Sequence, residues 1–266
     1  MARQSGPLKY KGNIGGIRHF KIKGLSGSFA GMAGGASADQ IKNAPEFKRT
    51  RENMNEFGGS ATAAKSVRVG LSSLMKQMAD PQLTGRLTAI MKKINLEDQS
   101  EARGYRAILI SQQSQYLKGL NFNKHINFDS VFTGKIDIVP EANRNGVAVT
   151  VTFNPANNVN APAGATHFRL ISAISVISDY AYNASTKVYE AIDPVLNEQN
   201  SVVYMPYTDF SSADLQMNTT NILVGSPVLT ADTSLLVCVG IEFYQQVGAN
   251  YYLFSSGNAL KIHNIL

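Results

Sequence analysis

The sequence predicts an α+β fold in which a glycine-rich basic arm and a helical region precede an antiparallel β-sandwich. Glycines crowd into the first 70 residues, apolar side chains then recur at helical spacing, and from residue 126 short β-rich runs alternate with turn signals. We therefore expect an arm over residues 1–36, a helical assembly region over 37–122 and a β-sandwich domain over 123–266. Jelly-roll and immunoglobulin-like topologies both remain open for this domain.

The arm mixes basic side chains with glycine. Ile17, Phe20 and Ile22, with glycine pairs beside them, predict a short hairpin or an extended segment. The stretch 24–35 holds too few large apolar side chains to form a core by itself, because burial must outweigh the entropy lost on ordering the chain. We therefore expect the arm to lie on a surface that something else supplies.

Helical signals follow the arm. An N-cap pattern begins at Ser37, and Pro45 suits the first turn of a second helix, which the pair Gly58-Gly59 should end. Further helices are predicted over residues 60–78, 80–94 and 101–116.

The β-rich half begins near Phe122. Val147, Val149, Val151 and Phe153 alternate as one face of a strand would. Other strands are predicted over residues 167–178, 201–207, 235–246 and 251–254. The lone cysteine, Cys238, stands in an apolar run and should be buried. Glu242 should alternate outward from the same strand.

The two halves of the chain differ in charge. Residues 1–125 carry 20 Lys and Arg against 8 Asp and Glu, whereas residues 126–266 carry 5 against 11. Such asymmetry indicates nucleic acid, an anionic surface or a complementary face on a neighbouring subunit, although a solvated helix surface also explains part of it. The candidate assembly or anion-contact residues are Lys9, Lys11, Arg18, Lys21, Lys23, Lys48, Arg49, Arg51, Lys65 and Arg68.

No pattern predicts catalysis. The glycine-rich segments lack the spacing of a P-loop or a dinucleotide fingerprint. The four histidines have no Cys, His or paired carboxylate at metal-ligand spacing, and most carboxylates of the β half lie near predicted turns. We therefore expect a protein that is not an enzyme and has no cofactor.

The N-terminal residues contain no apolar segment with a cleavage pattern, and no apolar run reaches membrane-spanning length. We expect synthesis in the cytoplasm without a signal peptide and no membrane span. Any release from the cell would then be as part of a particle or filament, by lysis or a dedicated machine.

Two motifs resemble those of an uncharacterised protein family from Bacteroidota. Residues 11–21 resemble its Lys-Gly-x-Ile-Gly-x-Ile-x-Phe-x-Lys opening, with His19 where Tyr or Phe is expected, and residues 49–58 resemble its Arg-Thr-Arg-Glu-Asn-x-x-Glu-Phe-Gly block. The resemblance covers about residues 9–125. It implies a modular layout with a divergent β-rich second half, and it supplies no mechanism.

These features favour a non-enzymatic structural protein that assembles with copies of itself into a filament, a tube or a phage-like particle. The first alternative is a capsid-type structural protein whose basic half binds nucleic acid. The second alternative is a glycan-binding or glycan-cleaving β-sandwich with an N-terminal attachment region.

Overall fold

The computed structural model describes residues 2–32 and 34–266 and divides the chain into two compact units, residues 1–51 and residues 52–266. The fold is α+β, and the second unit has a β-sandwich-like arrangement. The change from helical to β-rich sequence near residue 122 falls inside the second unit, whose helices and large sheet share one core.

The first unit contains a four-stranded antiparallel sheet in the order β1-β4-β3-β2. Its strands are β1 (Ala2–Arg3), β2 (Gly12–Ile14), β3 (Ile17–Phe20) and β4 (Phe29–Met32). Gly15 and Gly16 join β2 to β3 with φ angles of +56° and +80°. A two-residue type I′ turn requires positive φ at both positions, so these glycines make the turn. The predicted hairpin is confirmed.

Short helices complete the first unit. They are α1 (Ala38–Asn43), the 3₁₀-helix η1 (Pro45–Phe47) and the beginning of α2 (Lys48–Gly70). The predicted N-cap at Ser37 is confirmed as a full capping box, because the Gln40 N–H donates to Ser37 Oγ and the Ser37 N–H donates to Gln40 Oε1.

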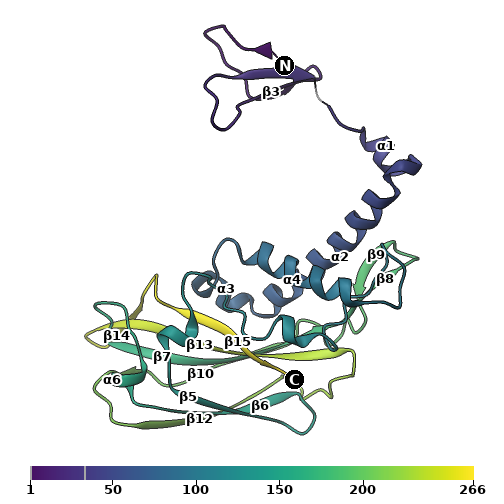
Figure 1. Ribbon diagram of the computed structural model, residues 1–266. Helices are drawn as coiled ribbons and strands as arrows, with labels where there is room; N and C mark the ends of the chain where they lie inside the picture. The colour runs from purple at the N-terminus through teal and green to yellow at the C-terminus, as the bar shows by residue number, and fades with distance from the viewer. Residues whose placement is uncertain (1, 33) are drawn as a thin grey trace. The chain divides into compact units, whose positions relative to one another are not determined.

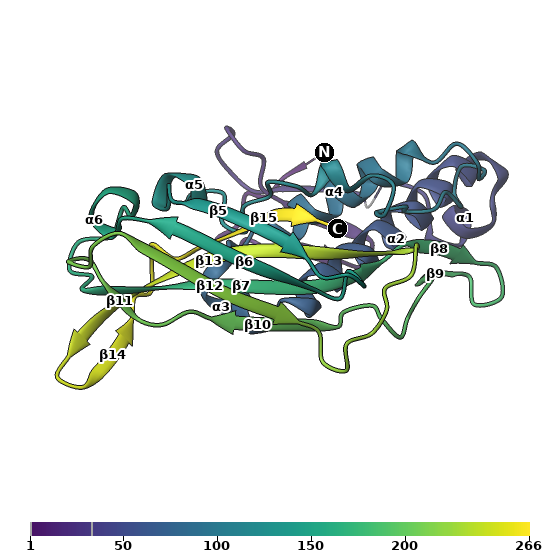
Figure 2. The ribbon, with the colours of Figure 1, turned by 90° about the horizontal axis from the view of Figure 1, so that it is seen from below.

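The second unit has three layers, with helices on one face of a six-stranded sheet and a three-stranded sheet on the other (Figures 1 and 2). The remaining helices are α3 (Ser72–Met78), α4 (Leu83–Glu97), η2 (Ser114–Tyr116), α5 (Phe128–Val131) and α6 (Pro155–Asn158). No helix in the described part of the chain is both long and apolar enough to cross a membrane.

The large sheet runs in the order β10-β7-β13-β14, with β11 also paired to β7 and β15 to β13; the small sheet has the order β12-β6-β5, and β8 and β9 form a hairpin. The strands are β5 (Lys135–Pro140), β6 (Gly146–Phe153), β7 (His167–Ser178), β8 (Tyr180–Asn183), β9 (Val188–Ala191), β10 (Asn200–Tyr204), β11 (Thr208–Asp209), β12 (Leu215–Ile222), β13 (Thr233–Val247), β14 (Asn250–Leu253) and β15 (Ala259–Ile265).

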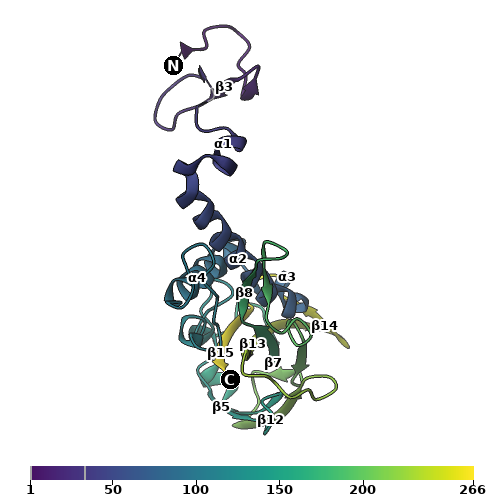
Figure 3. The same cartoon turned by 90° about the vertical axis from the view of Figure 1, so that its right-hand side faces the viewer.

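Strands β7 and β13 lie between the helices and the small sheet (Figure 3), and both of their faces are buried in core. On β13, Val237 and Val239 pack with the small sheet, whereas Leu236 and Cys238 pack with the helices. Burial on both faces explains why these strands read as continuous apolar runs. Cys238 is buried, as predicted.

The predicted helix end at Gly58-Gly59 is wrong, because α2 continues to Gly70. A Cβ at position 59 would lie 2.4 Å from Cγ of Tyr189, and one at position 70 would lie 2.0 Å from Oγ of Ser175. These two glycines allow the helix to approach the hairpin and the sheet closely. The helix then breaks at Leu71, so the predicted helix over residues 60–78 is two helices.

Two further predictions are wrong. Residues 101–116 form turns with only η2 as a helix, because Gly104 takes a φ of +98° and Ile108 pairs with Tyr180 of β8. Glu242 does not point out to solvent. It is 4% exposed and forms an ion pair with Arg169 across the β7–β13 ladder.

Candidate binding surfaces

The sheet of the first unit has no apolar core. Among the described residues of this unit only Ser28 is buried, and the side chains of Leu8 and Met32 are 70% and 84% exposed. Its outer strands β1 and β2 each pair on one side, so they present unpaired backbone groups. An open edge of this kind accepts a strand from another chain.

The two units differ in charge. Residues 1–51 contain ten Lys and Arg against two Asp and Glu, a net charge of +8, whereas residues 52–266 contain 15 against 17, a net charge of −2. The basic surplus of the chain is therefore concentrated in the unit that lacks a core. Units of opposite sign attract one another between molecules and are steered together at low salt.

Eight of the ten predicted contact residues lie in the first unit. Lys11, Lys21 and Lys23 are exposed. Lys9 is exposed and donates to the Gln4 carbonyl oxygen at 2.8 Å. The Arg18 guanidinium is exposed and lies 5.5 Å from the Phe20 ring centroid. These five side chains follow the hairpin and the loops on either side of it.

The other three lie at the start of α2. Lys48 and Arg49 are exposed there. Arg51 instead donates through Nη1 to the carbonyl oxygens of Ile41 and Ala44, at 2.8 and 2.9 Å. These carbonyls lie at the C-terminal end of α1, where cationic side chains satisfy groups that the helix leaves unpaired. Arg51 therefore has a structural role inside the unit.

Lys65 and Arg68 lie on the part of α2 that belongs to the second unit. Both line a hollow of about 410 Å³ together with Asp80, Leu83 and Met75. The Asp80 carboxylate also forms an ion pair with Arg86 at 2.7 Å. The hollow is thus mixed in charge, which distinguishes these two residues from the exposed basic residues of the first unit.

Sequence reasoning missed a tyrosine cluster at the end of the large sheet. The Arg169 guanidinium lies 3.9 Å from the Tyr204 ring centroid and 5.0 Å from that of Tyr207, and Arg169 Nη2 is 3.1 Å from Glu242 Oε2. The Tyr244 hydroxyl donates to the same carboxylate oxygen at 2.5 Å. An arginine inside the apolar run of β7 is the sequence signal that could have found this cluster.

Burial and hydrogen bonding account for the ionisation of this cluster. Burial lowers the pKa of Arg169, but the hydrogen bond and charge of Glu242 outweigh it, so the pKa is raised. Burial and the same carboxylate raise the pKa of Tyr244. The cluster therefore keeps Arg169 charged and Tyr244 neutral at physiological pH. Partly exposed tyrosine and arginine side chains of this kind are enriched where proteins contact partners.

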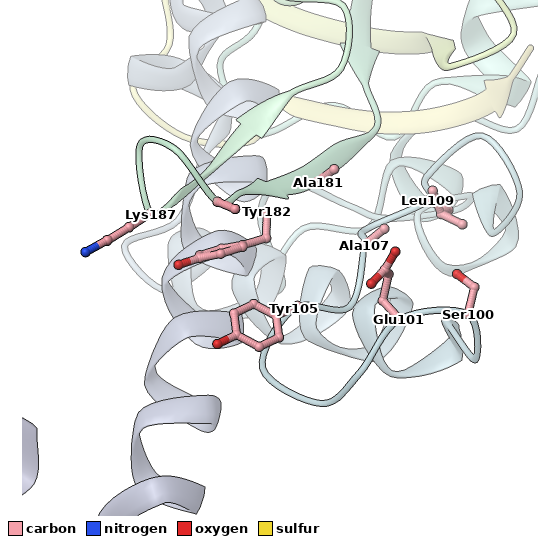
Figure 4. A pocket seen from close by; sticks show the side chains of 9 residues that line it. Ser100, Glu101, Tyr105, Ala107, Leu109, Ala181, Tyr182 and Lys187 are labelled. Carbon is pink, nitrogen blue, oxygen red and sulfur yellow. The ribbon is translucent and has the colours of Figure 1, made fainter. Parts of the chain in front are cut away.

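A groove of about 630 Å³ lies between the 100–109 loop and the β8–β9 hairpin (Figure 4). Its lining residues are Ser100, Glu101, Tyr105, Ala107, Leu109, Ala181, Tyr182, Ala184 and Lys187. The Tyr105 and Tyr182 rings lie 4.8 Å apart at an angle of 58°. A second hollow of about 360 Å³ adjoins the groove, because it shares Ser100 and Leu109 and adds Glu97 and Asp98. No motif marks this groove, since the fold alone brings residues 105 and 182 together.

The described residues contain no group of three or more His, Cys, Asp or Glu side chains that could hold a metal ion. No family model and no curated protein matches the chain. The resemblance to the Bacteroidota family thus stays an expectation.

Proposed function

We propose that this protein is a non-enzymatic structural subunit that assembles with copies of itself, through its first unit, into a filament, a tube or a phage-like particle. The observation that carries the proposal is the four-stranded sheet of the first unit, in which no described apolar side chain is buried. Ordering the backbone costs about 1–2 kcal/mol per residue, and a small sheet without a covered apolar face does not recover that cost. A surface on a second copy supplies the missing burial.

The geometry of such a contact favours open assembly. The first unit of one subunit would dock on the second unit of the next, so the two contacting surfaces are different. Contacts of this head-to-tail kind generate rings when they close and filaments when they do not. The charges of +8 and −2 add attraction between the contacting units.

The test compares the full chain with a variant lacking residues 1–36. We expect the full chain to form large ordered species by sedimentation and negative-stain microscopy, and the truncated chain to remain monomeric with an unchanged thermal unfolding transition. The core of the second unit lies entirely after residue 62, so this truncation leaves it intact. Ordered particles from the truncated chain would overturn the proposal.

The charge of the first unit also favours a second function, binding of nucleic acid by a capsid-type subunit. Neutralising phosphates releases counterions, so affinity should fall steeply as salt rises. Nuclease-treated protein separates the two functions. Assembly without nucleic acid supports protein–protein complementarity, and assembly that requires added DNA or RNA supports the capsid-type alternative.

A further inference from the structure

We propose that the groove of Figure 4 receives the tip of the β2–β3 hairpin of a second copy, with Arg18 entering between the two tyrosine rings and the Glu101 carboxylate. This inference rests on the proposed function, and it identifies the surface of the second unit that binds the first unit of another copy. It assigns a binding role to Tyr105, Tyr182 and Glu101, which the sequence did not single out.

The groove has the chemistry that recognises a cationic side chain. Figure 4 shows the Tyr105 and Tyr182 rings next to one another, with the Glu101 carboxylate across the groove and the Lys187 ammonium directed away. A guanidinium is attracted by the faces of aromatic rings and forms strong charge-assisted hydrogen bonds with a carboxylate. The adjoining hollow adds Glu97 and Asp98, so two further carboxylates lie on the side of the groove that Glu101 lines.

The aromatic wall is held in place before any partner arrives. Tyr182 contacts the Tyr189 ring at 5.7 Å between centroids, and Tyr189 is buried with its hydroxyl donating to the Arg106 carbonyl oxygen at 2.9 Å. Tyr105 remains 48% exposed, which leaves its ring accessible. A wall that is already ordered loses little entropy on binding.

The hairpin tip presents side chains whose chemistry suits the groove. The two glycines of its turn carry no side chains, and they are flanked by Ile14 and Ile17, which are 54% and 42% exposed. Arg18 follows directly and is also exposed. The isoleucines would meet the apolar lining of Ala107 and Leu109, while Arg18 would reach the tyrosines and Glu101.

A charge-reversal cycle tests this pairing in the full chain. Glu101→Lys and Arg18→Glu should each raise the concentration at which the protein assembles by at least about tenfold, because each places like charges together at the contact. The double variant restores opposite charges and should return most of the way to the wild-type value. Asp137→Lys on β5 is the matched control for Glu101→Lys and should leave assembly unchanged. Lys42→Glu on α1 makes the same change of net charge as Arg18→Glu, away from the hairpin, and should weaken assembly much less.

The outcomes separate this inference from the proposed function. Single variants that assemble like wild type, while loss of residues 1–36 abolishes assembly, would overturn the groove and leave the proposed function standing. Single variants that weaken assembly without rescue in the double variant would also overturn the pairing. A wild-type chain that stays monomeric would overturn both.

A spectroscopic probe gives an independent reading. The chain contains no tryptophan, so Tyr105→Trp places a single reporter in the groove. Its emission should shift as subunits assemble, and in the Arg18→Glu variant the shift should occur only at a correspondingly higher protein concentration. An emission that stays constant through assembly would overturn the groove as the receptor.

Discussion

The two units of this chain differ in how they bury their side chains. In the second unit β7 and β13 have apolar side chains packed on both faces, against the helices on one side and the small sheet on the other. In the first unit four strands form an antiparallel sheet, yet no described apolar side chain is buried. The difference teaches that strand pairing and turn chemistry can be encoded locally, whereas stability requires a covered apolar face.

The polar interactions follow the same division. Glu56 is 1% exposed in the second unit, where it accepts from the Gly104 N–H at 2.7 Å and forms ion pairs with Lys92 and Arg106. The side-chain hydrogen bonds within the described residues of the first unit are exposed or only partly buried. The second unit therefore buries both apolar and polar side chains in its own core, whereas the described side chains of the first unit are mostly exposed.

The largest expected effect comes from the aromatic core. Phe243→Ala should lower the free energy of unfolding by about 3–5 kcal/mol, because this fully buried ring packs between the two sheets. Phe20→Ala in the first unit is the matched control, and it should leave the same unfolding transition in place while weakening assembly. Denaturant titration measures the free energy of unfolding of both variants, and sedimentation measures their assembly. Equal losses of stability would remove the distinction between the units.

Glu56→Gln should lower the free energy of unfolding by about 3 kcal/mol, since it leaves Lys92 and Arg106 without their buried partner. Burial by itself raises the pKa of Glu56, but the Lys92 hydrogen bond, the Gly104 N–H and the nearby cations outweigh it and lower the pKa. A folded pKa below the unfolded value contributes stability above the unfolded pKa, which is lost as pH falls through the folded one.

Acidification therefore provides a second measurement for Glu56. The wild-type protein should lose stability below about pH 4.3, the unfolded value for Glu, and the Gln variant should lose less over the same range. Parallel pH profiles for the two proteins would show that this carboxylate does not carry the acid sensitivity.

The glycines of α2 give a smaller and more specific effect. Gly59→Ala should lower the free energy of unfolding by about 1–3 kcal/mol, because the new methyl group would collide with the Tyr189 ring. A methyl group at position 58 would meet no atom within 4 Å outside the helix's own backbone, and Gly58→Ala should stabilise the protein by about 0.5–1 kcal/mol. Thermal unfolding measures the stability of both variants. Changes in stability of the same sign in Gly58→Ala and Gly59→Ala would contradict the packing argument.

Cys238 tests the burial of β13 itself. Its side chain is fully buried, and burial raises the pKa of its thiol, so thiol reagents should label it only after unfolding. Cys238→Ala should cost about 1–2 kcal/mol through lost packing. Rapid labelling of the native protein would show that β13 is open to solvent.

Local sequence patterns predicted the elements that depend on local chemistry. The strand over residues 167–178 has the predicted bounds, and the alternating residues from Val147 to Phe153 form one buried face of β6. The cap at Ser37 and the glycine hairpin are also as predicted. The wrong predictions all involve tertiary contacts. Gly59 suits a close helix packing as well as a helix end, and the burial of Glu242 depends on an arginine 73 positions away.

The binding surfaces also divide into features that the local sequence predicts and features that depend on tertiary contacts. The concentration of basic residues near the N-terminus is visible in the sequence, and the structure places eight of the ten predicted residues in the first unit. The tyrosine groove is not visible in the sequence. Residues 105 and 182 meet only because Ile108 pairs with Tyr180, which brings the loop to the hairpin.

Amide hydrogen exchange in the β2–β3 hairpin tests the central claim most directly, when it is read at concentrations below and above assembly. We predict nearly unprotected exchange of these amides in the dilute protein, protection that grows as subunits associate, and constant protection of β7 and β13 throughout. Equal protection of the hairpin in dilute monomers and in assemblies would show that the first unit stabilises itself, and it would contradict the account.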